Sequence, residues 1–293
     1  MNPIVSIVLP TYNRAHVIKP SIDSVLTQTY QNFELIIVDD ASTDCTKEIV
    51  DSYSDARILY IQSKKNSGAA AARNIGADKA RGFYLAFQDS DTIWAPSKLE
   101  LQMQFLSVHP EIALVFHPYL SINEKQTVFD PPRLRLSSLS SHIFYDLLAG
   151  PLIGAPTIVM KTDVFRSLHG FAEQFRSFED YEFSIRVAKD YEIGCLPEAL
   201  LRSYHPDAGI NLNYHEILHT NFYILKKYQS IIASDMNLEA TQAERLFYYA
   251  ILGNDDQYFF DELADYVLAT GHCKIYNDYL NLYNHLLTGT DDL

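Results

Sequence analysis

Short apolar runs alternate with helical patterns through the first hundred residues of the chain. Continuous apolar runs, which are typical of buried strands, lie at residues 4–9, 35–38, 58–61 and 84–87. Helical patterns separate these runs, at residues 17–27, 43–53 and 69–80. Ser42 or Thr43 is placed to cap the second of these helices. This alternation predicts an α/β fold, with a mostly parallel sheet flanked by helices.

The pattern changes twice farther along the chain. Residues 98–109, 162–168 and 179–189 are predicted helices, residues 113–116 and 157–160 are predicted strands, and residues 121–129 suggest a hairpin. Beyond about residue 213 the strand patterns fade, and Tyr-rich helical patterns run to the C-terminus. We therefore predict one domain at residues 1–210 and a helical C-terminal extension at residues 211–293.

The charge balance narrows the classes of partner. The 293 residues carry 23 Lys and Arg against 37 Asp and Glu, a formal net charge of -14. Such a surface argues against binding duplex nucleic acid or anionic lipid through clustered cations. It remains compatible with one nucleotide, because a divalent cation can join carboxylates to a diphosphate. The cysteines Cys45, Cys195 and Cys273 lie far apart and show no zinc-like spacing.

No signal peptide or membrane-spanning stretch is visible in the sequence. We therefore expect a cytoplasmic protein, with peripheral attachment at the inner membrane face as the alternative.

Polar residues follow three of the predicted strands, where a parallel sheet binds its ligands. One stretch is PTYNR at residues 10–14, a second contains Asp39 and Asp40, and a third contains Asp89 and Asp91. Two carboxylates one residue apart, just beyond a strand, can both turn toward a hard cation. An acidic surface turn is the common alternative for an isolated Asp-x-Asp, but the other strand-end motifs favour a functional site.

Two further acidic pairs are open to both functional and structural interpretations. Asp40 can accept a hydrogen bond from a base or ribose, although Asp39 and Asp40 also make a good helix start. Glu179 and Asp180 open a predicted helix, where an anion is stabilised. Either can act as a general base if burial raises its pKa, whereas simple charge complementation of the helix is the more common role.

Several motifs occur together in a fixed order over roughly residues 1–205. They are VSIVLPTYNR at 5–14, SVLTQTY at 24–30, FELIIVDDASTD at 33–44, NSG at 66–68, ARNIG at 72–76, FQDSD at 87–91, GF at 170–171 and FEDYE at 178–182. The chain resembles the inverting family-2 glycosyltransferases, which have the Rossmann-like GT-A fold. The Gln-x-x-Arg-Trp signature of the processive members is absent, since the single Trp is Trp94. The resemblance therefore implies a bacterial-type, non-processive enzyme.

The resemblance implies a role for each matching position. Asp180 would be the catalytic base, with Glu179 beside it touching donor or acceptor. Asp91 would bind the metal, with Asp89 and His205 near it. The residues implied in donor binding are Pro10, Thr11, Tyr12, Arg14, Asp40, Asn66, Gly68, Arg73 and Asp89. The segment from Asn66 to Asn74 would close on the nucleotide.

The expected activity is transfer of a hexosyl or N-acetylhexosaminyl group from a nucleotide-sugar. UDP is the expected nucleotide, because members of the family that the chain resembles commonly use UDP-sugars. The acceptor would be a hydroxyl of a carbohydrate or glycolipid in a growing cell-surface glycan, and the cofactor Mn²⁺ or Mg²⁺. A non-catalytic nucleotide-sugar binding protein of the same fold is the alternative. A nucleotidyltransferase is disfavoured, because no glycine-rich phosphate loop follows the first strand.

The C-terminal extension is rich in aromatic residues: Tyr248, Tyr249, Tyr258, Phe259 and Phe260. We expect them to form part of an acceptor platform or a contact between subunits of a homo-oligomer, and core packing is an equally open interpretation.

Overall fold

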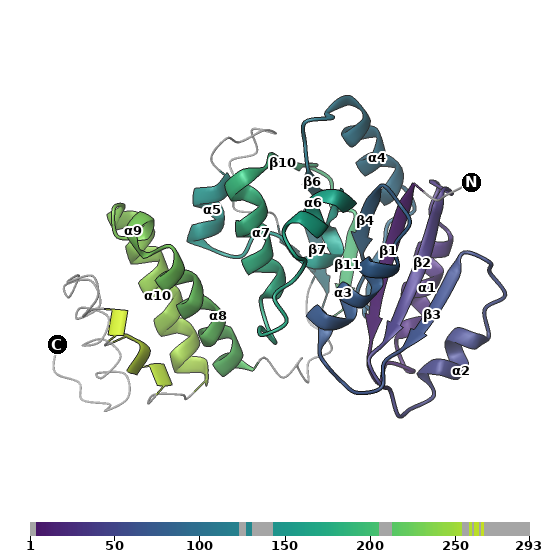
Figure 1. The fold of residues 1–293 in the computed structure, drawn as a ribbon, viewed down its shortest axis with the longest axis horizontal. Helices are drawn as coiled ribbons and strands as arrows, with labels where there is room; N and C mark the ends of the chain where they lie inside the picture. Colours follow the sequence, from purple (N-terminus) through teal and green to yellow (C-terminus); the bar gives the residue numbers. More distant parts are fainter. Residues whose placement is uncertain are drawn as a thin grey trace. The chain divides into compact units, whose positions relative to one another are not determined.

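The structure is a computed structural model, and it describes residues 4–122, 127–130, 143–204, 213–253, 258–259, 261–263 and 265–266 (Figure 1). Two compact units are formed. One falls within Met1–Phe144 and Leu152–Ile210, and the other within Tyr145–Pro151 and Asn211–Leu293. The predicted division into residues 1–210 and 211–293 stays a prediction.

The first unit is built on a seven-stranded sheet in the order β10-β6-β9-β4-β1-β2-β3. The strands are β1 (Val5–Thr11), β2 (Phe33–Asp39), β3 (Ile58–Gln62), β4 (Tyr84–Phe87), β6 (Leu114–Phe116), β9 (Val159–Lys161) and β10 (Ile193–Cys195). All paired neighbours are parallel except those of β9, which runs antiparallel to β4 and β6. This architecture confirms the predicted mostly parallel sheet.

Helices cover both faces of this sheet, because successive side chains of a strand point to opposite sides. Ile7 and Leu9 of β1 share a buried cluster with Ile22 of α1 (Ile18–Leu26), so α1 covers their face. Val8 points the other way and meets α3 (Ala69–Lys79). A Cβ on Gly76 would lie 2.3 Å from Val8 Cγ1, so only glycine lets α3 pack this closely on β1.

Four aromatic rings join the sheet to two later helices, α6 (Thr162–Ser167) and α7 (Glu179–Asp190). Phe87 ends β4, and its ring centroid lies 5.1 Å from that of Phe171. Phe171 in turn lies 4.8 Å from Phe183 of α7, and Phe165 of α6 contacts all three rings. Such aromatic pairs each contribute about 0.5–1.5 kcal/mol beyond burial. They fix α7 against the end of β4.

A smaller sheet in the same unit has the order β5-β11-β7-β8. Its strands are β5 (Thr92–Trp94), β11 (Leu201–Tyr204), β7 (Tyr119–Ile122) and β8 (Thr127–Asp130). β7 and β8 pair antiparallel, which confirms the predicted hairpin. The sequence pattern missed β5 (TIW), β10 (IGC) and β11 (LRSY), which are short and interrupted by polar residues or glycine, unlike the LVF run of β6. Helix α4 (Lys98–Val108) follows β5.

Several predicted boundaries are wrong: β2 extends over residues 33–39, and β9 begins at residue 159 and not 157 because Thr157 belongs to a short 3-10 helix. Two other differences have a clear physical reason. β1 continues through Pro10 to Thr11 instead of ending before the proline. Pro10 is tolerated because β4 pairs only with Val5–Val8, which leaves β2 as the one neighbour at that point. Helix α2 (Thr46–Asp51) begins three residues later than predicted.

The predicted caps of α2, Ser42 and Thr43, bond instead to Asn13. The backbone N–H of Asn13 donates to Ser42 Oγ at 2.8 Å, and the N–H of Thr43 donates to Asn13 Oδ1 at 2.8 Å. These tertiary hydrogen bonds override the local capping preference and hold the two loops together.

The described part of the second unit is helical, as predicted for the extension. It contains the end of α5 (Ile143–Ala149), then α8 (Tyr214–Lys227), α9 (Gln229–Ile232) and α10 (Met236–Gly253). Phe247 and Phe259 are buried, so core packing accounts for part of the aromatic content, whereas Tyr248 is 58% exposed. No described helix is both long and apolar enough to span a bilayer.

Candidate active site

The carboxyl ends of β1 and β2 carry two loops that are linked by hydrogen bonds. Asn13 adopts a positive φ of 52°, which an asparagine tolerates in a turn. Arg14 is half-buried, and its backbone N–H donates to Thr46 Oγ1 at 3.0 Å. Tyr12, directly before Asn13, is 45% exposed. The loop after β1 is therefore fixed through its backbone, while an aromatic side chain is left at the surface.

Asp40 holds the segment that leads into α3. Its buried carboxylate accepts the backbone N–H groups of Ser67 at 2.9 Å and Gly68 at 2.7 Å. Gly68 has a φ of 95°, which favours glycine, and it precedes the first residue of α3. The predicted donor residues Asp40, Asn66 and Gly68 thus lie together, with Asn66 exposed.

Asp39 has a structural role, as one interpretation of the pair allowed. Its carboxylate accepts the Ser42 N–H at 2.7 Å and the Tyr60 hydroxyl at 2.6 Å. Burial and the Asp39 carboxylate raise the pKa of Tyr60 above its usual value.

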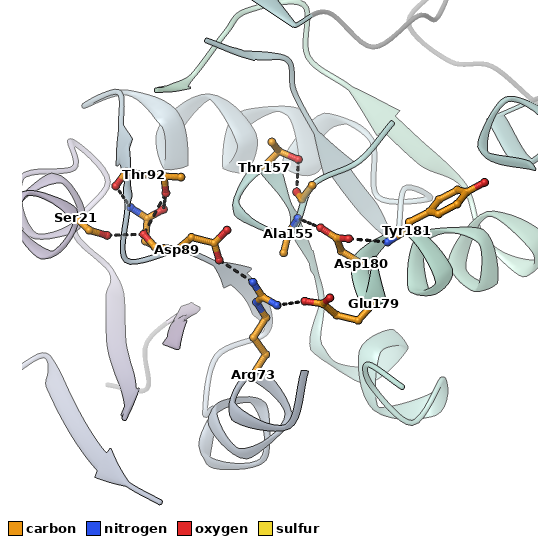
Figure 2. A network of polar contacts seen from close by, with 11 residues as sticks. Ser21, Arg73, Asp89, Thr92, Ala155, Thr157, Glu179, Asp180 and Tyr181 are labelled. Atoms are coloured by element: carbon orange, nitrogen blue, oxygen red, sulfur yellow. Dashed lines mark hydrogen bonds and ion pairs between the residues drawn. The ribbon is translucent and has the colours of Figure 1, made fainter. Parts of the chain in front are cut away.

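Arg73 is at the centre of the charged site (Figure 2). It lies within helix α3 and not in the preceding loop, and it is 5% exposed. Its guanidinium forms an ion pair with Asp89 at 2.7 Å and a second with Glu179. Burial alone would lower the pKa of Arg73, but Asp89, Glu179 and Asp180 raise it above its usual value. One cation therefore joins the acid after β4 to the acids that begin α7.

Asp89 is fixed through its backbone as well as its carboxylate. Its carbonyl accepts Ser21 Oγ from α1 at 2.8 Å and the Thr92 N–H at 3.2 Å (Figure 2). The backbone of Asp89 therefore bonds to α1 on one face of the sheet, and its carboxylate bonds to α3 on the other face. The Arg73–Asp89 pair has little freedom to move.

Asp180 is the second residue of α7, and its side chain is partly buried. One carboxylate oxygen accepts the N–H of Ala155 at 2.8 Å, and the other accepts the N–H of Tyr181 at 2.8 Å. Burial and the adjacent Glu179 raise the pKa of Asp180 to about 7, while Arg73 and the Ala155 N–H oppose the rise. Asp89 adds to it. A carboxylate with a pKa near neutrality suits a general base.

The start of α7 is held in an uncommon backbone conformation. Phe178, directly before Glu179, has a φ of 61° and lies in the left-handed region. This conformation costs a non-glycine residue roughly 1–2 kcal/mol. Such outliers cluster at functional sites.

Asp91 lies in the turn between β4 and β5 and is half-buried. Within the described ranges, no group of three His, Cys, Asp or Glu side chains is placed to hold a metal ion. A magnesium-like cation uses one or two protein carboxylates and completes its shell with water and substrate phosphate oxygens. Asp91 and Asp89, one oxygen of which pairs with Arg73, are the two carboxylates that such a site would use. His205, the other predicted ligand, lies outside the described residues.

The backbone N–H of Ala155 is a site group that the sequence did not reveal. It belongs to the short 3-10 helix η1 (Ala155–Thr157), which the pattern did not predict. A backbone donor carries no signature in the sequence, so the structure was needed to find it.

Comparison with known proteins assigns the sequence to a family. The sequence profile named Glycosyl transferase family 2 matches residues 6–156, more than half of the chain. The chain belongs to this family.

Two curated relatives illustrate the similarity. WfgD of Escherichia coli, named UDP-Glc:alpha-D-GlcNAc-diphosphoundecaprenol beta-1,3-glucosyltransferase, is 32% identical over 85% of this chain and 93% of its own length. An uncharacterized glycosyltransferase of Haemophilus influenzae is 33% identical over 64% of this chain. The chain covers 63% of that relative, and it covers 32% of a relative from Rickettsia felis, so some relatives are much longer.

A solved structure agrees on the fold. TarS 1-349 of S. aureus, crystallised in complex with UDP-GlcNAc, superposes with a TM-score of 0.73 at 19% identity. The match covers 99% of this chain and 93% of TarS 1-349. The chain has the GT-A fold, as the resemblance implied, with its α/β sheet flanked by helices.

Proposed function

We propose that this chain transfers a sugar from a UDP-sugar to a hydroxyl group of a carbohydrate or glycolipid acceptor, with inversion of the anomeric centre. The observation that carries the proposal is Asp180, a partly buried carboxylate with a pKa raised to about 7. It stands beside the acids that Arg73 joins to the end of β4. Glycosyl transferase family membership supports the same reaction class.

The proposed reaction is a single displacement. Asp180 accepts the proton of the acceptor hydroxyl while that oxygen forms a bond to the anomeric carbon. The bond from this carbon to the diphosphate breaks, and UDP leaves from the opposite face. Both Asp180 oxygens accept one backbone N–H each, and each keeps a further lone pair for the hydroxyl proton.

Glu179 and Arg73 would position the substrates around this base. Arg73 is neutralised by two carboxylates, so its function here is to hold Asp89 and Glu179 in place. Glu179 would then face donor or acceptor through its second oxygen, and Asp89 would face the donor ribose or sugar.

The donor nucleotide would bind where the loops after β1, β2 and β3 meet. The exposed ring of Tyr12 offers a stacking surface for a base, beside Pro10, Thr11 and Arg14. Asp40 orders Gly68 and Ser67, which places Asn66 at the edge of the same region. The name of WfgD specifies UDP-Glc, which supports a UDP-hexose as the donor.

Asp91, with Asp89 next to it, would hold a Mn²⁺ or Mg²⁺ ion together with the donor diphosphate. When bound, a divalent cation neutralises the charge that develops on the departing nucleotide. The glycolipid in the name of WfgD supports a lipid-diphosphate-linked sugar as the acceptor. Such an acceptor would bring the protein to the inner face of the membrane.

A donor screen followed by product analysis tests this proposal. UDP-glucose, UDP-galactose, UDP-GlcNAc and UDP-GalNAc would be compared with GDP-mannose, each with Mn²⁺, by thermal shift and by release of free nucleotide. A specific ligand stabilises the native state, so one UDP-sugar should raise the melting temperature. With a GlcNAc-diphospholipid acceptor, ¹H NMR of the product should show the inverted anomer. Nucleotide release from none of the UDP-sugars, or a product with retained configuration, would refute the proposal.

A further inference from the structure

A buried polar pair on helix α4 is connected to the proposed base through a short 3-10 helix. Lys98 and Gln102 are fully buried and stand one helical turn apart. Lys98 Nζ donates to Gln102 Oε1 at 2.7 Å and lies 3.9 Å from the centroid of the Trp94 ring. Burial lowers the pKa of Lys98 well below its usual value, and burying so polar a group is costly, so the pair needs a specific explanation.

The Gln102 amide reaches away from Lys98 to two backbone carbonyls. Its Nε2 donates to Thr157 O at 2.9 Å and to Val115 O at 3.3 Å. The orientation of the amide follows from these two carbonyls, because a carbonyl oxygen only accepts and the amide nitrogen only donates. The amide oxygen is then left to accept the hydrogen bond from Lys98 Nζ.

Thr157 connects this amide to the proposed base. It is the last residue of η1, and its N–H and Oγ donate to Gly154 O at 2.9 and 2.7 Å. Ala155, the first residue of η1, donates its N–H to Asp180 at 2.8 Å. A continuous series of hydrogen bonds thus runs from Lys98 through Gln102 and η1 to the carboxylate.

We propose that Gln102 is a positioning residue for Asp180: by holding η1 through Thr157, it fixes the N–H that orients this carboxylate. The inference rests on the proposed function, because it assigns Gln102 a part in the same transfer reaction. Gln102 is completely buried and therefore cannot touch a substrate, and η1 is the element that connects it to Asp180. Small displacements of a catalytic group lower turnover strongly, by on the order of a hundredfold for 1 Å.

The pH dependence of turnover provides a second measurement that tests the role of Gln102. The charged groups that act on this carboxyl are Glu179 of the same helix, Arg73 of α3 and Asp89 beyond β4. The Ala155 N–H favours the ionised form. If η1 loosens, that donor is lost, and the pKa of the base rises further. The acidic limb of the pH–rate profile should then move to higher pH.

The test compares Gln102→Met with Gln28→Met. Gln28 is also a buried amide, 1% exposed, and it bonds to Ser24 O, Ala95 O and the Leu99 N–H, but not to η1. Turnover of the UDP-sugar that the wild type uses would be measured from pH 5.5 to 9, together with donor affinity. Gln102→Glu is the second Gln102 variant, since it keeps the volume and the contact with Lys98 but loses the donor amide.

For both Gln102 variants we expect kcat to fall about 10- to 100-fold, with the donor dissociation constant within about threefold of wild type. The midpoint of the acidic limb of the pH–rate profile should shift upward by about one pH unit. Gln28→Met should lose thermal stability to a similar extent but keep its kcat and pH profile. An active wild type whose Gln102 variants behave like Gln28→Met would overturn the inference. A wild type that turns over no UDP-sugar would instead refute the proposed function.

Discussion

Asp180→Asn should make the protein more stable at alkaline pH while destroying its activity. Burial and Glu179 raise the pKa of Asp180 from 3.8 to about 7 in the folded protein. The stability that this group contributes is therefore complete below about pH 3.8 and is lost as the pH rises through about 7. Asparagine keeps the shape of the side chain but never ionises, so it escapes this loss.

The magnitude follows from the shift in pKa. A rise from 3.8 to about 7 is roughly three units, or about 4 kcal/mol for complete ionisation. In a titration from pH 5 to 8, the wild type loses this stability from pH 5 up to the folded pKa of about 7, which is about two of these units. Allowing for the solvent that reaches this partly buried carboxylate, and for the backbone hydrogen bond that asparagine loses, we expect a relative gain of roughly 2 kcal/mol for Asp180→Asn. That corresponds to about 4–8 °C in melting temperature.

The assay is thermal unfolding of wild type and Asp180→Asn at half-unit steps from pH 5 to 8.5. The difference between the two proteins removes the contribution of titrating groups far from Asp180, and it reports the ionisation of Asp180 together with the neighbours coupled to it. Asp78→Asn, at an exposed position on α3, provides a matched control and should follow the wild type throughout. A difference between wild type and Asp180→Asn that is flat with pH, or that favours the wild type above pH 7, would refute the reasoning.

Three further substitutions test the rest of the site. Arg73→Met should lower the free energy of unfolding in urea by about 3 kcal/mol, because it leaves the buried Glu179 and the half-buried Asp89 without their cation; a loss below 1 kcal/mol would contradict this. Asp91→Ala should abolish the Mn²⁺-dependent thermal shift with UDP-sugar, and full wild-type activity in EDTA would remove the metal role. Asp40→Asn should weaken donor binding about tenfold in calorimetry, since an amide accepts fewer backbone N–H groups than the carboxylate does; unchanged affinity would show that the Ser67–Gly68 segment does not contact the donor.

The central sheet was predictable because its signals are local. Continuous apolar runs marked β1 to β4, and the acids after them, Asp40 and Asp89, could be placed at one edge of a parallel sheet. The start of α2 was predicted wrongly, because Ser42 and Thr43 bond to Asn13 from another loop instead of to the helix. Tertiary hydrogen bonds of this kind leave no trace in a local pattern.

The arrangement of charges within the site was not predictable from the residues alone. Arg73 pairs with residues 16 and 106 positions away, and only the packing of α3 and α7 brings them together. The N–H that orients Asp180 belongs to the backbone of Ala155, so it cannot be predicted from the residue type. The resemblance suggested which acid is the base, but the cause of its raised pKa had to come from the structure.

The most direct test of the account is donor turnover by Asp180→Asn at pH 8, with acceptor present and with donor affinity measured on the same preparation. If Asp180 is the general base, kcat should fall by about a hundred- to ten-thousand-fold while the dissociation constant of the UDP-sugar stays near the wild-type value. Glu179→Gln, in parallel, should cost less. Turnover of Asp180→Asn within a few-fold of wild type would contradict the account and make Glu179 the next candidate for the base.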